Sequence, residues 1–217
     1  MFAQKMKTAL CIALISMLSL NAEAQIADTI RAAFSKPPRL FGSFNNRSSV
    51  VNGADAKIAG LQGGLIYGDR VKVSMTYSWM PVPVTQSKVR FPHTSFADTI
   101  IHRQSMNFMS AGLEYVWFRS AKWKFASPLN VGLGTTNLSK YNTFNELQNK
   151  EVKLVVPIEL GVSATYYFTD WLTANAGLGQ RMAITTLSES QLSGSYYKLG
   201  VGVLFGVIYR KIWPKEG

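Results

Sequence analysis

Few residues of this sequence are of the types that carry out covalent catalysis. It contains one cysteine and two histidines, His93 and His102. A hydrolase that removes acyl chains needs a serine beside a histidine base and a carboxylate. Ser105 follows His102 by three positions, so in an extended strand the two side chains would point to opposite faces. The sequence therefore predicts no catalytic residues.

The sequence also has few residues that could bind a metal ion or a cofactor. The two histidines and the scattered carboxylates do not have the spacing of metal ligands. Three closely spaced glycine pairs superficially resemble phosphate-binding loops, but they lie within strand-like segments that no helical pattern follows. The pairs are Gly132 and Gly134, Gly177 and Gly179, and Gly200 and Gly202. We expect no cofactor and no metal site.

Charged side chains offer a different chemistry, because several recur on the small, polar face of alternating segments. They are Lys72, Glu114, Lys124, Lys153, Glu159, Arg181 and Lys198. Charges in a dry interior must be paired or hydrated. One interpretation is an ion-pair network that plugs the interior, with Glu114 and Glu159 each flanked by bases on neighbouring strands. The other is a narrow path for anions, which is disfavoured because a barrel of eight strands has little space inside.

The segments that hold these charges alternate with period two, which is typical of β-strands and not of helices. In residues 152–168 every even-numbered residue is apolar, whereas the odd-numbered set contains Lys153, Glu159 and several small residues. The same pattern recurs, with two weaker segments first, over residues 39–45, 57–67, 71–79, 109–117, 123–134, 172–182 and 197–209. The sequence therefore predicts eight strands.

Short and long connections alternate between these strands. Residues 68–70, 120–122 and 169–170 read as tight hairpin turns. Longer polar links fall near residues 46–56, 80–104, 136–151 and 186–194. Short turns at one end and long loops at the other are typical of barrels of the bacterial outer membrane.

The composition indicates which face of the strands meets lipid. Hydrophobic residues make up 47% and charged residues only 16% of the 217 residues, against about 25% charged in a typical soluble domain. After the first twenty residues no apolar run is long enough for a spanning helix. Gly, Ser, Thr, Ala and Asn dominate the other face, which suits a narrow barrel interior better than a surface in water.

Aromatic residues mark the ends of the apolar face, as in the girdles of transmembrane barrels. Those expected at the short-turn end are Tyr67, Tyr115, Trp117, Trp123, Phe168, Trp171, Tyr209 and Trp213, and those toward the other end are Tyr77, Trp79 and Tyr197. We therefore predict an all-β fold, an eight-stranded antiparallel up-and-down transmembrane β-barrel. A soluble periplasmic lipid-binding barrel is the alternative.

The N-terminus has the pattern of a secretory signal peptide. Lys5 and Lys7 precede an apolar run over residues 9–20, and residues 22–24 form a small-x-small cleavage site. The expected organisation is a signal peptide (1–24), a short N-terminal segment (25–37), the barrel (38–213) and a C-terminal tail (214–217). Cys11, the only cysteine, lies inside the signal peptide, so the mature chain would have no disulfide.

Residues 38–213 resemble the small eight-stranded outer-membrane proteins of the OmpA/OmpX/OmpW type, in the variants common in Bacteroidetes. The last segment also matches the polar-x-Gly-x-x-apolar-x-aromatic assembly signal of that family, at Lys198, Gly200, Val203 and Phe205. The resemblance implies a Gram-negative outer membrane and a last strand that the barrel-insertion machinery recognises. Because some barrels of this size modify lipid A, it also defines the enzymatic alternative.

The link over residues 80–104 is the most distinctive loop. It contains Lys88, Arg90, His93 and Arg103 together with several apolar residues. A basic, partly apolar loop above the membrane could contact lipopolysaccharide phosphates or a partner protein. Alternatively it folds over the barrel mouth or extends the hairpin.

The functional expectation follows from these points. The formal net charge is +11, but an exported chain rarely meets nucleic acid, so phosphorylated lipid headgroups are the expected acidic neighbours. We expect a non-enzymatic outer-membrane barrel with a plugged lumen. It would act through its extracellular loops in membrane integrity, in surface contact or as a small subunit of an envelope complex. An enzyme acting on lipid A, a narrow anion-preferring channel and a soluble carrier are the alternatives.

Overall fold

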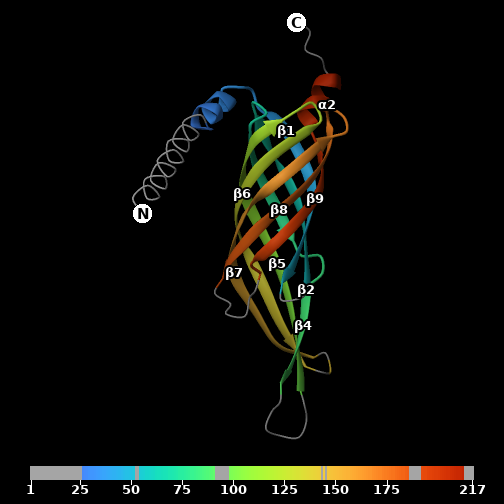
Figure 1. Cartoon of the computed structure of the whole chain (residues 1–217). Helices are drawn as coiled ribbons and strands as arrows, with labels where there is room; N and C mark the ends of the chain where they lie inside the picture. Colours follow the sequence, from blue (N-terminus) through green and yellow to red (C-terminus); the bar gives the residue numbers. More distant parts are fainter. Residues whose placement is uncertain are drawn as a thin grey trace, which may run out of the picture.

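The computed structural model describes residues 26–51, 54–90, 98–142, 144, 146–185 and 192–212. The expected signal peptide, His93, Trp213 and the tail lie outside the described residues. Residues 26–34 form a helix that projects from one end of the molecule (Figure 1). The remaining elements, in chain order, are β1 (Arg39–Val51), β2 (Ala54–Tyr67), β3 (Val71–Trp79), β4 (Val84–Arg90), β5 (Asp98–Arg119), β6 (Trp123–Tyr141), β7 (Leu147–Tyr167), β8 (Leu172–Thr185), β9 (Gly194–Val203) and α2 (Phe205–Ile212).

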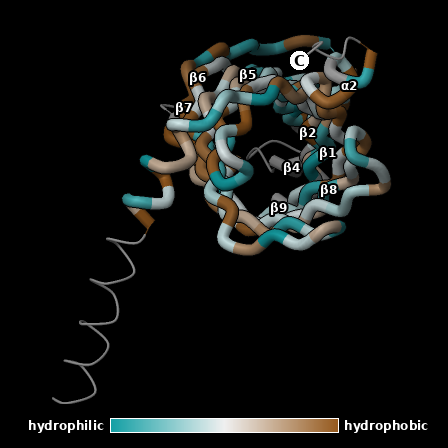
Figure 2. Tube along the Cα trace, turned by 90° about the horizontal axis from the view of Figure 1, so that it is seen from above, coloured by the Kyte–Doolittle hydropathy of each residue, from teal (hydrophilic) through white to brown (hydrophobic). Residues whose placement is uncertain are grey.

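The strands form one closed antiparallel sheet. Their order is β3-β2-β1-β9-β8-β7-β6-β5-β4, and an additional β3–β5 pairing closes the ring without β4. Eight of the described strands therefore form the barrel, which Figure 2 shows end-on, and β4 is an extra strand that pairs only with β5. Each barrel strand lies beside its chain neighbour among the barrel strands, so the up-and-down topology that the sequence predicts is confirmed.

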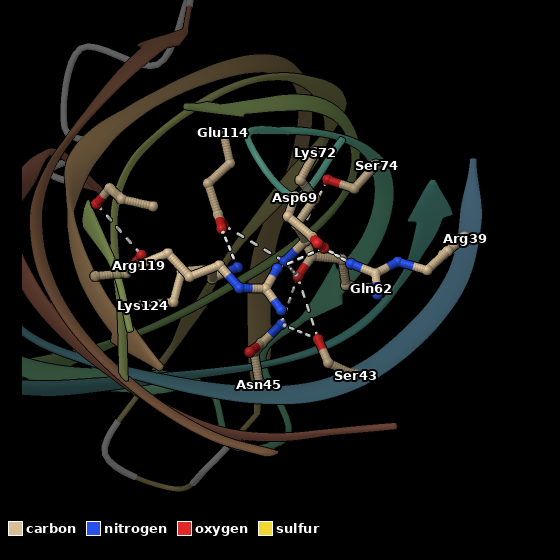
Figure 3. Close-up of polar contacts among 12 residues, drawn as sticks. Arg39, Ser43, Asn45, Gln62, Asp69, Lys72, Ser74, Glu114, Arg119 and Lys124 are labelled. Atoms are coloured by element: carbon tan, nitrogen blue, oxygen red, sulfur yellow. Dashed lines mark hydrogen bonds and ion pairs between the residues drawn. The ribbon is translucent and has the colours of Figure 1, made fainter. Parts of the chain in front are cut away.

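Tight turns gather at the end where the described chain begins. In the β2–β3 turn, Gly68 and Asp69 both have positive φ, at 54° and 60°, which is the conformation of a type I′ hairpin turn. Asp69 forms ion pairs with Arg39 of β1 and Arg119 of β5, as Figure 3 shows. One short turn thus connects three neighbouring parts of the rim.

At the opposite end the strands run far beyond the barrel. The β3–β5 ladder ends at Trp79 and Asn107, but β5 continues outward and pairs there with β4 and β6. The predicted loops at 46–56, 80–104 and 136–151 are therefore wrong in part, since all three contain paired strand residues. The outward positions of these strand parts, such as Asn107, Asn137 and Ser139, are polar, so the apolar alternation on which the sequence analysis depended is missing there.

The last strand is shorter than the sequence pattern predicts. It ends at Val203, and the predicted continuation through Phe205 to Tyr209 is wrong, because those residues belong to α2. Leu204 donates its backbone N–H to Trp171 (2.8 Å), and its carbonyl accepts the N–H of Val207 at 3.0 Å, which starts a helical turn. The segment alternates over a few residues, but its apolar positions also fit a helix.

The outer and inner faces of the barrel are inverted relative to a soluble protein. Large apolar side chains such as Leu61, Leu133 and Leu178 are more than half exposed on the outer wall. Polar side chains such as Thr76 and Glu159 are 1% exposed inside. This arrangement contradicts the soluble lipid-carrier alternative, which requires an apolar interior and a polar outside. Within the described part of the chain, no helix is long and apolar enough to cross a membrane.

Candidate functional site

The first charged cluster of the lumen surrounds Glu114 on β5. Lys72 lies directly opposite it on β3, and its Nζ is 3.4 Å from Oε2 of Glu114. Lys124 on β6 approaches the other carboxylate oxygen at 2.8 Å. Lys72 also lies over the ring of Phe41 at 4.3 Å and donates to Oε1 of Gln62 at 3.4 Å. Figure 3 shows Glu114 between the two lysines inside the ring of strands.

The second cluster surrounds Glu159 on β7, a residue that is almost fully buried. Arg181 lies opposite it on β8, with Nε and one terminal nitrogen each 2.8 Å from the same carboxylate oxygen. Arg47 on β1 reaches the other oxygen at 3.3 Å and also donates to Oγ of Ser78 at 3.2 Å. Because β9 and β8 stand between β1 and β7 in the ring, Arg47 connects non-adjacent strands through the lumen.

Two lysines of the predicted network fall outside these ion pairs. Lys198 lines the lumen between the clusters, but no described residue forms an ion pair or hydrogen bond with its ammonium group. Lys153 is exposed on β7, and its inclusion in a lumen network is wrong. It faces the same side of β7 as Glu159, but β8 ends at Thr185 opposite Val155, so no ring of strands encloses Lys153.

Arg47 was missed by the sequence analysis. The predicted first strand ended at residue 45, because the apolar face stops after Phe44 with Asn46 and Ser48. The inward alternation of Asn45, Arg47 and Ser49 continues, however, and all three are buried. The polar, inward-facing positions continue after the apolar, outward-facing positions end. This continued alternation could have been used to predict a longer first strand.

Apolar clusters lie on both sides of the charged middle. At the short-turn end Phe41, Ile66 and Leu204 pack together, with Tyr167 and Val207 against them. Toward the other end lies a larger buried cluster of Ala56, Ile58, Met80, Val84, Met106, Phe108, Val155 and Leu192. The enclosed cavity between the charged middle and the short-turn cluster has a volume of about 30 Å³, roughly the space of one water molecule.

Aromatic side chains gather on the outer wall near the short turns. Trp117, Phe125, Trp123, Tyr166 and Phe168 form a chain of ring contacts over β5, β6 and β7, with centroids 4.9–6.1 Å apart. The other predicted girdle residues are distributed more widely. Tyr77 stacks on Trp79 on β3, Tyr67 contacts Phe34, Tyr115 lies on β5, Trp171 lies in the β7–β8 turn, and Tyr209 is exposed on α2 instead of a strand.

The residues of the predicted contact loop are now placed on strands. Lys88 and Arg90 are positions of β4, and Arg103 lies on β5 with its guanidinium 4.6 Å from the ring centroid of Tyr141. His102, the histidine within the described residues, lies opposite Lys140 on β6. The described part of the chain contains no group of three side chains that could hold a metal ion.

The predicted assembly signal is divided between two elements. Lys198, Gly200 and Val203 belong to β9, whereas Phe205 is the first residue of α2. A Cβ added at Gly42 of β1 would lie 2.7 Å from the Phe205 ring, so the ring covers β1 at that glycine.

No protein-family model matches the sequence, and no curated protein matches it. Among solved structures, the N-terminal β-barrel domain of Pseudomonas aeruginosa OprF is similar, with 15% identity and a TM-score of 0.48, over 77% of this chain and 98% of that one. Neisserial surface protein A is similar at 12% identity and a TM-score of 0.44, over 77% of this chain and 97% of that one. Ail of Yersinia pestis, solved with the heparin analogue sucrose octasulfate, is similar at 10% identity and a TM-score of 0.42, over 76% and 96%.

The outer surface and the topology of the barrel indicate its cellular location. An apolar outer surface, a closed ring with no free edge, short turns at one end and long projections at the other are the features of barrels that span an outer membrane. The protein is an outer-membrane β-barrel. By the same rule the short-turn end, with α2, faces the periplasm, and the strand extensions face the outside.

Proposed function

We propose that this barrel does not conduct, and that it acts through the sheet that it displays outside the cell, which binds anionic groups of the envelope. Lipopolysaccharide phosphates are the first ligand that we expect. The supporting observation is the sheet itself, made of β4 and the outer parts of β5, β6 and β7. Residues 98–106 of β5 alone extend for about 30 Å beyond the β3–β5 ladder.

The charge of this sheet supports an anionic ligand. Its described side chains include the bases Arg103, Lys140, Lys150 and Lys153, with Glu151 as the only acid among them. Lys88 and Arg90 add two basic positions on β4, and Asp98, opposite Arg90 on β5, adds an acidic one. Lysine and arginine ammonium and guanidinium groups form strong, charge-assisted hydrogen bonds with phosphate.

Capture from the native outer membrane tests the ligand. The tagged protein is extracted in mild detergent, and the proteins and lipids that remain bound are identified. A triple variant K140Q, K150Q and K153Q should retain several-fold less lipopolysaccharide than the wild type. The control K122Q removes an exposed lysine from the periplasmic turn and should retain the wild-type amount. Equal retention by both variants would overturn the proposed ligand.

The same capture distinguishes the other roles. A protein partner recovered in stoichiometric amount, and lost in the triple variant, would make the chain a small subunit of an envelope complex. Recognition of β9 by the barrel-insertion machinery is a separate proposal, which concerns assembly and not the mature function.

The packed lumen supports the absence of conductance. Its charged middle lies between two apolar clusters, and a cavity of about 30 Å³ offers no continuous water-filled path. Purified protein in a planar bilayer should therefore show no steady single-channel current. A stable current with anion preference would replace this proposal with the channel alternative.

An enzymatic role can be tested separately. Lipid A from cells that produce the wild type and the double variant H93A and H102A should have the same mass spectrum if neither histidine is a catalytic base. A modification present only with the wild type would identify an enzyme.

A further inference from the structure

The charged middle of the lumen has more bases than acids. Its described bases are Arg47, Lys72, Lys124, Arg181 and Lys198, and its described acids are Glu114 and Glu159. Each acid already contacts two bases. The interior therefore has an excess of three positive charges when all of its bases are protonated, in surroundings where an unpaired charge is unfavourable.

Lys198 is the least compensated of the five bases. Its strand neighbours in the ladder are Arg47 on β1 and Gly177 on β8. Arg47 is a like charge directly across the strand pair, an arrangement that is itself destabilising, and it is already paired with Glu159. Lys198 has no ion pair or hydrogen bond from its side chain within the described residues.

A small enclosed space lies beside this lysine. The cavity of about 30 Å³ is lined by Lys198, by the ion-paired Lys72 and Lys124, and by their partner Glu114. Of the polar side chains that line it, Ser163 and Thr173 donate to the backbone carbonyls of Ala126 and Gly202, whereas the Thr165 hydroxyl and the Asn175 amide make no side-chain hydrogen bond within the described residues. Hydroxyl and amide groups can donate hydrogen bonds to an anion. The volume suits a particle of about the size of one water molecule, which excludes sulfate and phosphate.

We propose that the lumen binds one small monatomic anion of the halide class, such as chloride, in the cavity beside Lys198. The anion supplies the negative charge that the two carboxylates do not provide, and the hydroxyl and amide groups of the wall complete its shell. It is a fixed part of the interior, enclosed at the periplasmic end by Phe41, Ile66 and Leu204. The proposal does not depend on the extracellular ligand.

The test measures unfolding of the refolded full-length barrel in neutral detergent, in salts of equal ionic strength. The salts are sodium bromide, sodium chloride, sodium sulfate and sodium gluconate. An anion that binds only the folded state stabilises it by RT ln(1 + [L]/Kd), so bromide and chloride should raise the unfolding midpoint with the logarithm of their concentration once it exceeds Kd. Sulfate and gluconate act only through general salt effects.

Variants separate the site from those general effects. In K198M the halide-specific increase of the unfolding midpoint should disappear. The control K122M removes an exposed lysine from the short turn between β5 and β6 and should keep the whole dependence. Halide dependence that persists in K198M, or that is absent in the wild type, would overturn the proposal.

If K198M does not fold, the bound anion can be located directly by crystallography of the wild type. Crystals of the wild type grown in bromide should give an anomalous peak inside the barrel, between Lys198 and the Thr173 side chain. No peak in that cavity at saturating bromide would overturn the proposal, whatever the variants do.

Discussion

Each of the two carboxylates in the lumen lies between two bases. They differ in whether those bases lie on strands adjacent to the carboxylate's own strand. Glu114 is held by lysines on β3 and β6, the two strands beside its own. Glu159 is held by an arginine on the adjacent β8 and by Arg47, which reaches it from β1. Only the second cluster contains an ion pair between strands that the backbone ladder leaves apart.

The identity of the bases fits this difference. Arginine presents a planar fork with several donors, whereas lysine is a single charge on a flexible stem. One terminal nitrogen of Arg47, Nη1, contacts both Glu159 and Ser78, and Arg181 places two nitrogens of its fork on one oxygen of Glu159. The Glu159 side chain is 1% exposed and that of Glu114 is 8% exposed. We infer that the arginine cluster fixes the cross-section of the barrel and that the lysine cluster mainly compensates local charge.

The largest expected effect is that of E159Q. The amide keeps the shape of the side chain but removes the charge, so Arg47 and Arg181 are left buried without a counterion. Breaking a buried pair in this way costs about 3–5 kcal/mol. The free energy of unfolding, from urea titration of the refolded barrel in detergent, measures the loss.

A matched control lies on the same strand. E151Q makes the same chemical change in the extracellular part of β7 and should stay within about 0.5 kcal/mol of the wild type, as most surface substitutions do. Equal losses in E159Q and E151Q would contradict the structural role of the arginine cluster.

A smaller loss is expected for E114Q. Lys72 and Lys124 lose their partner, but their flexible stems lie beside the cavity and can turn toward its polar wall. Leaving such groups unsatisfied costs about 1–3 kcal/mol. The same urea titration measures it. If E114Q destabilises the barrel more than E159Q, the assignment of roles to the two clusters is reversed.

Much of the fold could be predicted because a membrane barrel has a strict pattern. Each spanning residue faces either lipid or a narrow interior, so alternation such as that of residues 152–168 defines both the strand and its orientation. The prediction failed where this constraint ends. Beyond the barrel mouth both faces meet water, and at Leu204 the chain turns into the lumen and begins α2.

The lumen residues could be predicted in type but not in pairing. Alternation placed Glu114 and Glu159 on the inner face, and their flanking bases on neighbouring strands followed from strand order. Arg47 contacts Glu159 from 112 positions away in sequence, and no local pattern encodes a contact through the lumen. Such a pair depends on barrel diameter and stagger, which a single sequence does not show.

The reach of Arg47 gives a finer test of the comparison. R47K keeps the charge but shortens the side chain, so its ammonium group should not reach both Glu159 and Ser78. We expect a loss of about 1 kcal/mol, the value of a typical hydrogen bond. The parallel variant R181K, on the strand adjacent to Glu159, should lose less. If R181K lowers the free energy of unfolding more than R47K does, the ion pair between adjacent strands contributes more to stability than the ion pair across the lumen.

The smallest effect is expected for K153Q. Lys153 belongs to the inward-facing set of β7, two residues beyond Val155, where the pairing with β8 ends at Thr185. Since the ring is open at that level, the ammonium group is exposed and its removal should change the free energy of unfolding by less than about 0.5 kcal/mol. A loss as large as that of E114Q would mean that the charged interior extends above the last β7–β8 pair. The extent of the lumen would then follow the alternation of the sequence and not the last pair of strands that closes the ring.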